Sequence, residues 1–268
     1  MGTYVVTGAA SGIGAATSSL LRQRGHEVIG VDLAGADIAA DLGTPAGRRA
    51  AVDAVGERCG GALDGAVPCA GLGPIPDRAG SLIVSVNYFG TVELLDGLRP
   101  MLAAGSAPAV VAISSNSTTT APGLPADLVE LCLAGDEEGA RRRADELGGL
   151  AGPYPASKLA LARWVRRCAV GEAWAGAGIR LNAVAPGMIE TAMVAEGRAD
   201  PVVGPLLDQF PIPVGRPGRP EEIAALIAFL LGPDAGFFCG SVVFADGGTD
   251  ALLRTDAWPA AWDLTPPG

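Results

Sequence analysis

The stretch Thr3-Tyr-Val-Val-Thr-Gly-Ala-Ala-Ser-Gly-Ile-Gly14 decides the fold of this chain. A short run of β-branched and aromatic residues, typical of a buried strand, leads directly into a glycine-rich turn and then into alanine-rich helical sequence. Glycines in such a turn allow a tight bend and let a pyrophosphate approach the helix N-terminus, whose unpaired N–H groups bind anions. The order of strand, turn and helix therefore predicts a dinucleotide-binding unit.

Asp32, at the end of the second predicted strand, supports this interpretation. It follows the glycine turn by about 20 residues, the spacing at which an acidic residue accepts hydrogen bonds from the hydroxyls of an adenosine ribose. A 2′-phosphate there would be repelled by the carboxylate, and neither Ser11 nor Leu33 supplies a compensating cation. We therefore expect NAD rather than NADP as the cofactor.

The rest of the chain continues this alternation of strand-like and helix-like segments. The predicted strands are Tyr4–Thr7, Val28–Val31, Ile38–Ala40, Ala66–Val67, Val110–Ser114, Ile179–Val184 and Val242–Phe244. The predicted helices between them are Gly14–Arg24, Pro45–Arg58, Ser81–Ala103, Pro153–Ala175 and Glu221–Leu231. This is the pattern of a parallel sheet covered on both faces. We expect an α/β protein with a single-domain, doubly wound Rossmann fold, its seven-stranded parallel sheet carrying helices on both faces.

Two segments are longer than this pattern needs. Thr118–Gly149 is an insert with helical character, and Gly187–Arg219 is a Pro/Gly-rich loop too long for a simple connection, so both are candidates for substrate contact. The apolar residues that the loop offers to a substrate are Met188, Ile189, Met193, Val194, Leu206, Leu207 and Phe210. The insert has an alternative role in subunit association, because three of its leucines could cover a helix face near Pro153–Ala175; these are Leu128, Leu131 and Leu133.

Composition and charge limit the classes of function. The 268 residues show no composition break, so one domain over residues 1–268 is expected. A net charge of −10, with Arg141–Arg143 as the basic cluster, argues against nucleic acid as a partner. The apolar runs are too short to cross a membrane and no secretory signal is visible, so we expect a cytoplasmic protein. Five cysteines and one histidine favour neither disulfides nor a metal site.

The glycine spacing Thr7-Gly8-x-x-x-Gly12-x-Gly14 resembles that of the short-chain dehydrogenase/reductase family. Tyr154-Pro-Ala-Ser-Lys158 matches the family's Tyr-x-x-x-Lys element. The other matching motifs are the strand end Ile113-Ser114-Ser115, the helix residue Asn87, the adenine-contacting pair Asp41-Leu42, the loop Pro186-Gly187 with Thr191, and Asp246-Gly247-Gly248 after the last strand. The resemblance covers residues 3–249.

Within the family, this chain is similar to the bacterial 3α-hydroxysteroid dehydrogenase/carbonyl reductase subgroup. The similarity lies in residues 69–74, residues 85–90 and the insert before Tyr154, and coniferyl-alcohol dehydrogenases share the enlarged layout. One departure is the turn Pro68-Cys-Ala-Gly71, where the family has Asn-Asn-Ala-Gly. Because proline has no N–H for a ladder bond, the fourth strand is predicted to end at Val67. The long separation of the serines from Tyr154 is a second departure, and the family pattern marks Ser115 rather than Ser114.

The resemblance implies a catalytic set and a cofactor site. The implied catalytic residues are Asn87, Ser115, Tyr154 and Lys158. The implied cofactor-binding residues are Gly8, Ser11, Gly12, Ile13, Gly14, Asp32, Leu33, Asp41, Leu42, Cys69, Ala70, Gly71, Tyr154, Lys158, Pro186, Gly187, Ile189 and Thr191. No metal is implied.

The catalytic set makes chemical sense as a proton-transfer device. A phenol with a pKa of about 10 is a poor base at neutral pH, but a nearby ammonium and the positive nicotinamide of NAD⁺ favour phenolate. The i, i+4 spacing puts Lys158 beneath Tyr154 on one helix face, within reach of the nicotinamide ribose. Tyr154 would exchange a proton with the substrate as hydride moves to or from the nicotinamide. Ser115 would hydrogen-bond the substrate oxygen, and Asn87 would hold a water that resupplies Lys158.

We therefore expect NAD(H)-dependent interconversion of a secondary alcohol and a ketone. The apolar loop, with no arginine clamp for an acidic substrate, favours a bulky apolar molecule of steroid or terpenoid kind, and an aryl alcohol is the alternative. A non-catalytic NAD-binding regulatory protein would normally have lost Tyr154 or Lys158. A nucleotide-sugar epimerase would carry a larger C-terminal substrate domain. The family resemblance also implies a homo-oligomer, either a dimer or a tetramer.

Overall fold

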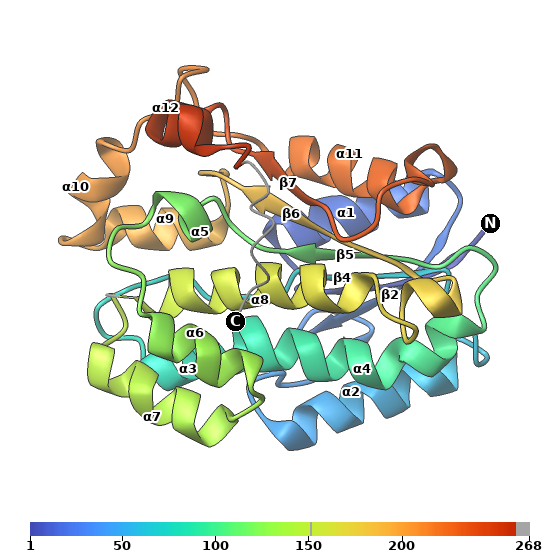
Figure 1. The fold of residues 1–268 in the computed structure, drawn as a ribbon. Coiled ribbons are helices and arrows are strands. Elements are labelled where there is room, and N and C mark those ends of the chain that lie inside the picture. The colour runs from blue at the N-terminus through green and yellow to red at the C-terminus, as the bar shows by residue number, and fades with distance from the viewer. Residues whose placement is uncertain (151, 261–268) are drawn as a thin grey trace.

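A seven-stranded parallel sheet forms the centre of the computed structural model, which describes residues 1–150 and 152–260. The strand order is β3-β2-β1-β4-β5-β6-β7 (Figure 1). The strands are β1 (Thr3–Thr7), β2 (Glu27–Asp32), β3 (Ile38–Ala39), β4 (Gly65–Pro68), β5 (Ala109–Ile113), β6 (Arg180–Pro186) and β7 (Val242–Ala245). The order reverses between β1 and β4, and ligands of doubly wound sheets bind outside the strand ends at such a point.

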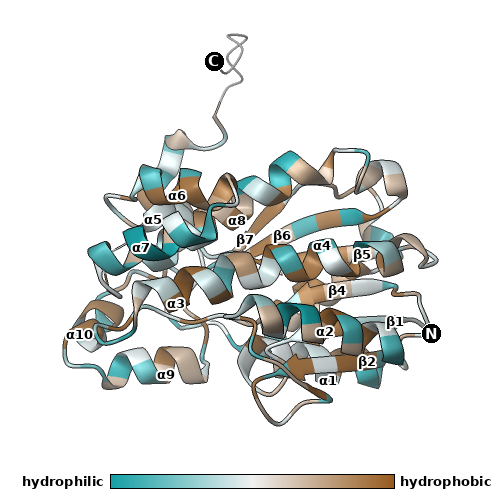
Figure 2. Cartoon of the chain, turned by 90° about the horizontal axis from the view of Figure 1, so that it is seen from below, coloured by the Kyte–Doolittle hydropathy of each residue, from teal (hydrophilic) through white to brown (hydrophobic). Residues whose placement is uncertain are grey.

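Helices cover both faces of this sheet, as predicted. One layer consists of α1 (Gly12–Gln23) and α11 (Pro220–Leu231), which pack against each other. The opposite layer consists of α2 (Pro45–Arg58), α4 (Gly90–Ala103) and α8 (Pro153–Ala169) (Figure 1). Because both faces are covered, a central strand such as β5 is buried at every residue and is apolar throughout. Figure 2 shows this contrast between hydrophobic strands and the more polar outer helices.

Shorter elements complete the chain. They are α3 (Gly80–Val84), a π-helical turn (Ser85–Phe89), α12 (Thr249–Arg254) and three 3₁₀ turns (Ala175–Ala177, Pro233–Ala235 and Thr255–Ala257). The prediction of one regular helix over Ser81–Ala103 is therefore wrong in its interior. The wider π turn separates α3 from α4, and such turns occur frequently at functional sites.

The predicted helix Pro153–Ala175 is also too long, because α8 ends at Ala169. The chain turns through Gly171, whose N–H donates to the carbonyl oxygen of Cys168. Beyond the turn, Trp174 is buried and packs edge-on against Trp164, with ring centroids 5.7 Å apart. Burial of the large indole ring of Trp174 thus outweighs the helical periodicity of the sequence, and the chain leaves the helix.

Strand β4 extends one residue beyond its predicted end at Val67. Pro68 is in register with Thr7 of β1, whereas pairing with β5 stops at Ala66, opposite Val110. The missing N–H of Pro68 therefore does not interrupt the ladder to β5.

The insert 118–149 is helical. Its elements are α5 (Ser117–Thr120), α6 (Ala126–Leu133) and α7 (Glu137–Leu147). Helix α6 packs on α8 and α7 packs on α3, with Leu128 fully buried and Leu131 and Leu133 half-buried. The insert thus covers one face of α8, as the alternative role of its leucines requires.

The segment Gly187–Arg219 is not a plain loop. It contains α9 (Ala192–Ala199) and α10 (Val203–Asp208), which pack against each other near the strand ends (Figure 1). The Thr191 hydroxyl caps α9 by accepting a hydrogen bond from the N–H of Val194. In the part of the chain that the structure describes, no helix is both long and apolar enough to span a bilayer.

Candidate active site

A cavity of about 690 Å³ lies at the carboxyl ends of the central strands. Every residue predicted to bind the cofactor lines it, from the glycine turn through Asp32 and Lys158 to Thr191. A second hollow of about 730 Å³ between α1, α9 and α11 shares Gly12 and Thr191 but contains neither Tyr154 nor Lys158. The chemistry of the chain is therefore centred on the first cavity.

The glycine turn after β1 has no room for side chains. Gly8 has a φ of 63°, and a Cβ there would lie 2.9 Å from the backbone N of Ala70. A Cβ on Gly14 would lie 2.1 Å from the carbonyl oxygen of Gly8. The Thr7 hydroxyl accepts a hydrogen bond of 3.0 Å from the N–H of Ala70, which holds the turn after β4 in place. The result is a bare backbone cradle at the N-terminus of α1 that fits a pyrophosphate.

Asp32 lies on the rim of the cavity, held by the backbone. Its Oδ2 accepts a hydrogen bond of 3.0 Å from the N–H of Ala10, and its Oδ1 accepts one of 2.7 Å from the N–H of Leu33. The cations that line the cavity, Arg78 and Lys158, are bonded elsewhere. The carboxylate is thus fixed in orientation, and neither of these cations is bound to it.

Tyr154 is the second residue of α8, directly after Pro153 at the N-terminus of the helix. Burial raises the pKa of its phenol, and a hydrogen bond with the Ser115 side chain lowers it. Ser115 is buried in the turn after β5, where its hydroxyl accepts a hydrogen bond of 3.1 Å from the N–H of Ser117. The phenol and the Ser115 hydroxyl are thus neighbours, as an oxygen-binding pair requires.

Ser114 has a different role from Ser115. Its hydroxyl lies against α8 and donates a hydrogen bond of 3.1 Å to the carbonyl oxygen of Lys158. Ser114 borders the cavity, whereas Ser115 is not among the lining residues. Ser114 therefore ties β5 to α8, while the hydroxyl of Ser115 interacts with Tyr154.

Lys158 is buried four residues after Tyr154. Its Nζ donates a hydrogen bond of 2.8 Å to the carbonyl oxygen of Ile113 and lies 5.9 Å from the centroid of the Tyr154 ring. Burial lowers the pKa of Lys158 to about 8. Burial also raises the pKa of the Cys69 thiol to about 12, so Cys69 is neutral at physiological pH. The ammonium is therefore poised close to its titration point.

Asn87 lies in the π-helical turn and does not line the cavity. Its Oδ1 accepts a hydrogen bond of 2.8 Å from the N–H of Leu72, and its Nδ2 donates to the carbonyl oxygen of Leu72 (3.0 Å) and to the Ser157 hydroxyl (3.4 Å). A Cβ on Gly71 would lie 3.2 Å from Asn87 Oδ1 and 3.6 Å from Lys158 Nζ. Asn87 is thus adjacent to Lys158, but its side chain holds the loop after β4.

Sequence reasoning missed an arginine in the cavity. Arg78 donates to the carbonyl oxygen of Gly73 at 2.6 Å and binds both carboxylate oxygens of Glu196 in α9, at 2.8 and 3.0 Å. These two charged residues link the loop after β4 to α9, in the segment Gly187–Arg219. Both of them line the cavity. Since Glu196 already occupies the Arg78 guanidinium, the expected absence of an arginine clamp for an acidic substrate stays a prediction. The pair is 118 residues apart in sequence, so no local pattern could indicate it.

The two long segments contribute unequally to the cavity. Of the apolar residues predicted for the loop after β6, Ile189, Met193 and Val194 line the cavity. Those that do not line it are Met188, Leu206, Leu207 and Phe210. No residue of the insert 118–149, all of which the structure describes, lines the cavity. The expectation that the insert contacts the substrate is therefore not met in this cavity, because its helices pack on α3 and α8 instead. In residues 1–150 and 152–260, no cluster of three or more potential metal ligands is found.

Comparison with known proteins identifies the family. A family model described as "short chain dehydrogenase" matches residues 3–125, and one described as "Enoyl-(Acyl carrier protein) reductase" matches residues 139–250. The chain is 42% identical over 259 residues to the 3-alpha-hydroxysteroid dehydrogenase/carbonyl reductase of Comamonas testosteroni, covering 95% of this chain and 98% of that protein. It is 35% identical over 271 residues to the cis-4-hydroxycyclohexanecarboxylate dehydrogenase of Sinomonas cyclohexanicum, covering 92% and 96%.

A solved structure agrees with this result over nearly the whole chain. The 3-alpha-hydroxysteroid dehydrogenase from Pseudomonas sp. B-0831, complexed with NADH, is 50% identical and superimposes with a TM-score of 0.90. The match covers 94% of this chain and 98% of that one. With the glycine cradle, the Tyr154–Lys158 helix and the seven-stranded sheet, these relatives establish that the chain belongs to the short-chain dehydrogenase/reductase family.

Proposed function

We propose that this protein is an NAD(H)-dependent dehydrogenase that interconverts a secondary alcohol and a ketone. The observation that carries the proposal is the convergence of the glycine cradle, Asp32, Tyr154 and Lys158 on one cavity. Two of these features would suit a nucleotide-binding regulator equally well, but Tyr154 and Lys158 form a proton-transfer pair that binding alone does not need. Their place in the cavity at the strand ends therefore supports catalysis.

The cofactor in this proposal is NAD, and two features of the site support it. The cradle made by Gly8 and Gly14 would hold the pyrophosphate, and Asp32 would accept hydrogen bonds from the adenosine ribose. A 2′-phosphate beside Asp32 would be repelled by a carboxylate whose hydrogen-bond partners are backbone N–H groups rather than a cation. When bound, NAD supplies the group that accepts or donates hydride.

The protein's own residues move the proton. Tyr154 accepts the hydroxyl proton of the alcohol, or returns it to the ketone oxygen, while the Ser115 hydroxyl orients the same oxygen. Since burial raises the pKa of Tyr154, the phenolate needs a nearby positive charge, which Lys158 supplies. Asn87 has its side chain committed to Leu72 and Ser157, so its contribution is to hold the wall beside Lys158. In this proposal it supports the proton relay without exchanging protons.

The substrate that we propose is a bulky alicyclic alcohol or ketone, steroid-like in size. The apolar side chains of Ile189, Met193 and Val194 support it, since they line the cavity. The names of the relatives support it too, because a hydroxysteroid and a hydroxycyclohexane carboxylate are both ring alcohols. Aryl and terpene alcohols remain the alternative, because they present a similar apolar surface.

The test is NADH formation from a panel of a 3α-hydroxysteroid, cyclohexanol and a benzylic alcohol. We expect the steroid to give the highest kcat/KM with NAD⁺, a lower value with NADP⁺, and a loss of roughly 10²–10⁴-fold in Tyr154→Phe without loss of NAD⁺ binding. Asp32→Ala should narrow the preference for NAD⁺. Turnover of none of these alcohols by the wild type, or full activity in Tyr154→Phe, would refute the proposal.

We also propose that the protein is a cytoplasmic homo-oligomer, either a dimer or a tetramer. The family resemblance supports this, and α6 on the face of α8 restricts which helices are available for association. Native mass measurement together with cell fractionation tests it. A monomer at micromolar concentration, or recovery outside the cytoplasm, would count against it.

A further inference from the structure

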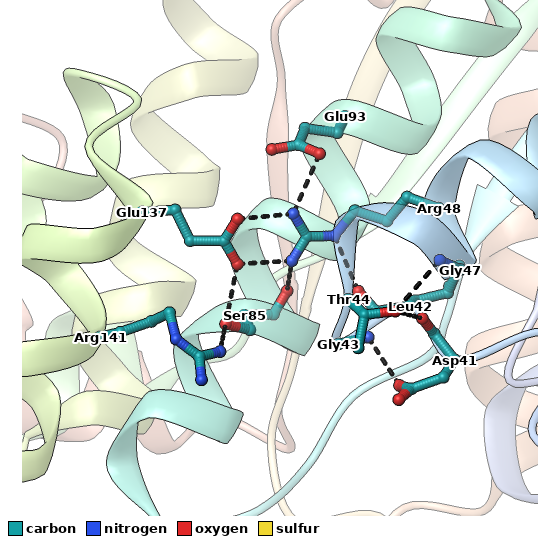
Figure 3. Close-up of polar contacts among 10 residues, drawn as sticks. All are labelled: Asp41, Leu42, Gly43, Thr44, Gly47, Arg48, Ser85, Glu93, Glu137 and Arg141. Carbon is teal, nitrogen blue, oxygen red and sulfur yellow. Dashed lines mark hydrogen bonds and ion pairs between the residues drawn. The ribbon is translucent and has the colours of Figure 1, made fainter.

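A buried arginine outside the catalytic set connects four segments of the chain. Arg48, in α2, is 2% exposed, and its guanidinium makes four hydrogen bonds and an ion pair with Glu93 (Figure 3). Nε donates to the carbonyl oxygen of Leu42 at 2.9 Å, and one Nη2 hydrogen faces the carbonyl oxygen of Ser85 at 3.3 Å. The other contacts reach the carboxylates of Glu137 at 2.8 and 2.6 Å and Glu93 at 3.0 Å. All three nitrogens of the planar group therefore donate hydrogen bonds, and Glu93 adds a second carboxylate beside it.

The partners of Arg48 differ in burial. The Glu137 side chain comes from α7 of the insert and is 18% exposed, whereas that of Glu93 in α4 is 46% exposed. The Ser85 hydroxyl donates to Glu137 at 2.8 Å and accepts from Arg141 at 2.6 Å, so α7 contributes both a carboxylate and a guanidinium. Burial alone would raise the pKa of Glu137, but the hydrogen bonds from Arg48 and Ser85 hold it below its ordinary value. Glu137 is therefore the ionised, well-ordered partner that neutralises the buried arginine.

Of the two carbonyls that Arg48 holds, that of Leu42 belongs to a lining residue of the cofactor cavity and that of Ser85 precedes one. Asp41 and Leu42 line one wall, and Val86, directly after Ser85, lines the other. Gly43 packs between them, since a Cβ there would lie 3.3 Å from the Val86 side chain. One planar fork thus sets the spacing of both walls on the side of the cavity where Asp32 and the adenine-contacting pair lie.

Besides Arg48, the loop carrying Asp41 is held by the burial of Leu42 in the core, next to Gly90 of α4, and by hydrogen bonds within the loop. The Asp41 carboxylate accepts a hydrogen bond of 2.9 Å from the N–H of Gly43, and Thr44 caps α2 by accepting from the N–H of Gly47 at 3.0 Å (Figure 3). A Cβ on Gly47 would lie 2.0 Å from the carbonyl oxygen of Asp41, so the loop runs tightly against the first turn of α2. These hydrogen bonds of the loop are local, whereas the Arg48 fork reaches across to the π turn and the insert.

We infer that Arg48, held by Glu137 of the insert, is a positioning residue for the adenine half of the cofactor. The inference rests on the proposed function, because it requires a dinucleotide in the cavity. It gives the insert a role different from the substrate contact and the subunit association expected from the sequence. No residue of the insert, which the structure describes in full, reaches the cavity, yet Glu137 controls the Asp41–Leu42 wall through a single side chain.

The test separates adenine binding from catalysis. Glu137→Gln removes the charge that anchors Arg48 with little change of shape, and Arg48→Lys keeps the charge but cannot bridge both carbonyls. The dissociation constant for ADP-ribose, which is NAD⁺ without its nicotinamide ring, is measured by titration calorimetry well below each variant's Tm. We expect it to rise about tenfold, or about 1.4 kcal/mol, in both variants. KM for NAD⁺ should rise in parallel, while kcat at saturating NAD⁺ stays within about twofold.

Arg143→Gln is the matched control. It also removes a charge from α7, breaking the 2.6 Å contact of Arg143 with Asp127, but it does not touch Arg48. It should leave both constants unchanged. If Glu137→Gln does not fold, Ser85→Ala replaces it, because it removes the hydroxyl between Glu137 and Arg141 and keeps the carbonyl that Arg48 binds.

The outcomes are distinct. A lower Tm with unchanged ADP-ribose affinity in Glu137→Gln or Ser85→Ala would mean that the network is only structural and would overturn the inference. An equal affinity loss in Arg143→Gln would also overturn it. Failure of the wild type itself to bind ADP-ribose would instead refute the proposed cofactor.

Discussion

Replacing Lys158 with methionine should stabilise the fold at neutral pH while abolishing turnover. Lys158 is the one lysine among the 268 residues, and burial lowers its pKa from 10.5 to about 8. A tenfold change in a protonation constant corresponds to about 1.36 kcal/mol, so keeping this group charged in the folded state costs about 3 kcal/mol at pH 7. Methionine has a similar length and no charge, and so escapes this cost.

The gain is reduced by one lost hydrogen bond. Lys158 Nζ donates to the carbonyl oxygen of Ile113 at 2.8 Å, and removing a donor of this kind costs about 1 kcal/mol. The net gain is therefore about 2 kcal/mol in the free energy of unfolding, by the same magnitudes. For a chain of this length that corresponds to a rise of about 4 °C in Tm.

The pH dependence of this gain has a definite sign. Between the folded pKa of about 8 and the unfolded value of 10.5, the unfolded chain binds the proton and the folded chain does not. The stability contribution of Lys158 therefore increases as pH rises through this window. At pH 10 the charging cost falls below about 1 kcal/mol and is offset by the lost hydrogen bond. The advantage of Lys158→Met over the wild type should then vanish.

Two measurements check this reasoning. Thermal melts of both proteins at pH 7 and about pH 10 give the stability difference and its pH dependence. Because Lys158 is the sole lysine, isotope-labelled lysine gives one side-chain NMR signal, whose titration should have its midpoint near pH 8. A midpoint near 10.5, or a variant that melts below the wild type at pH 7, would refute the argument that burial penalises the charged form.

The remaining expectations concern the two serines and the Arg78–Glu196 pair. Ser115→Ala should lower kcat by about 10²–10³-fold, because it removes the group that orients the substrate oxygen. Ser114→Ala should instead lower stability by about 1 kcal/mol, and equal kcat losses in the two variants would contradict their separate roles. Arg78→Gln and Glu196→Gln should each raise KM for the alcohol up to about fivefold, since a partly exposed ion pair contributes up to about 1 kcal/mol. A change confined to KM for NAD⁺ would count against a role of the Arg78–Glu196 pair in binding the alcohol.

Local motifs were the part of the site that could be predicted from the sequence. The glycine turn and the Tyr-x-x-x-Lys element each lie within a few residues of chain, where turn and helix geometry fix the relation of their members. Asp32 was predictable for a related reason, because a strand of ordinary length carries it to the same edge of the sheet as the turn. The presence of seven strands follows from the same repeated unit.

Contacts between distant charged residues could not be predicted. Arg48 and Glu137 are 89 residues apart, and each lies in a helix whose charges resemble an ordinary solvent-exposed face. The same is true of Arg141, part of a basic cluster on α7 that in fact binds Ser85 in the π turn. The π turn itself has no pattern distinct from that of a regular helix. For Lys158, by contrast, the sequence did offer a signal. It is the single lysine in a chain whose other basic side chains are almost all arginine.

The two buried cations, Arg48 and Lys158, show why that lysine cannot be an arginine. Arg48 is bound by its acceptors, including two carboxylates, and remains charged at any pH the protein meets. Lys158 has one carbonyl acceptor and, within residues 1–150 and 152–260, no ion-pair partner, so its pKa falls to about 8. An arginine at position 158 would keep its charge and could not return a proton to a relay. In the proposed relay, the position that gains and loses a proton therefore requires lysine, whereas the inferred positioning role of residue 48 is served by arginine.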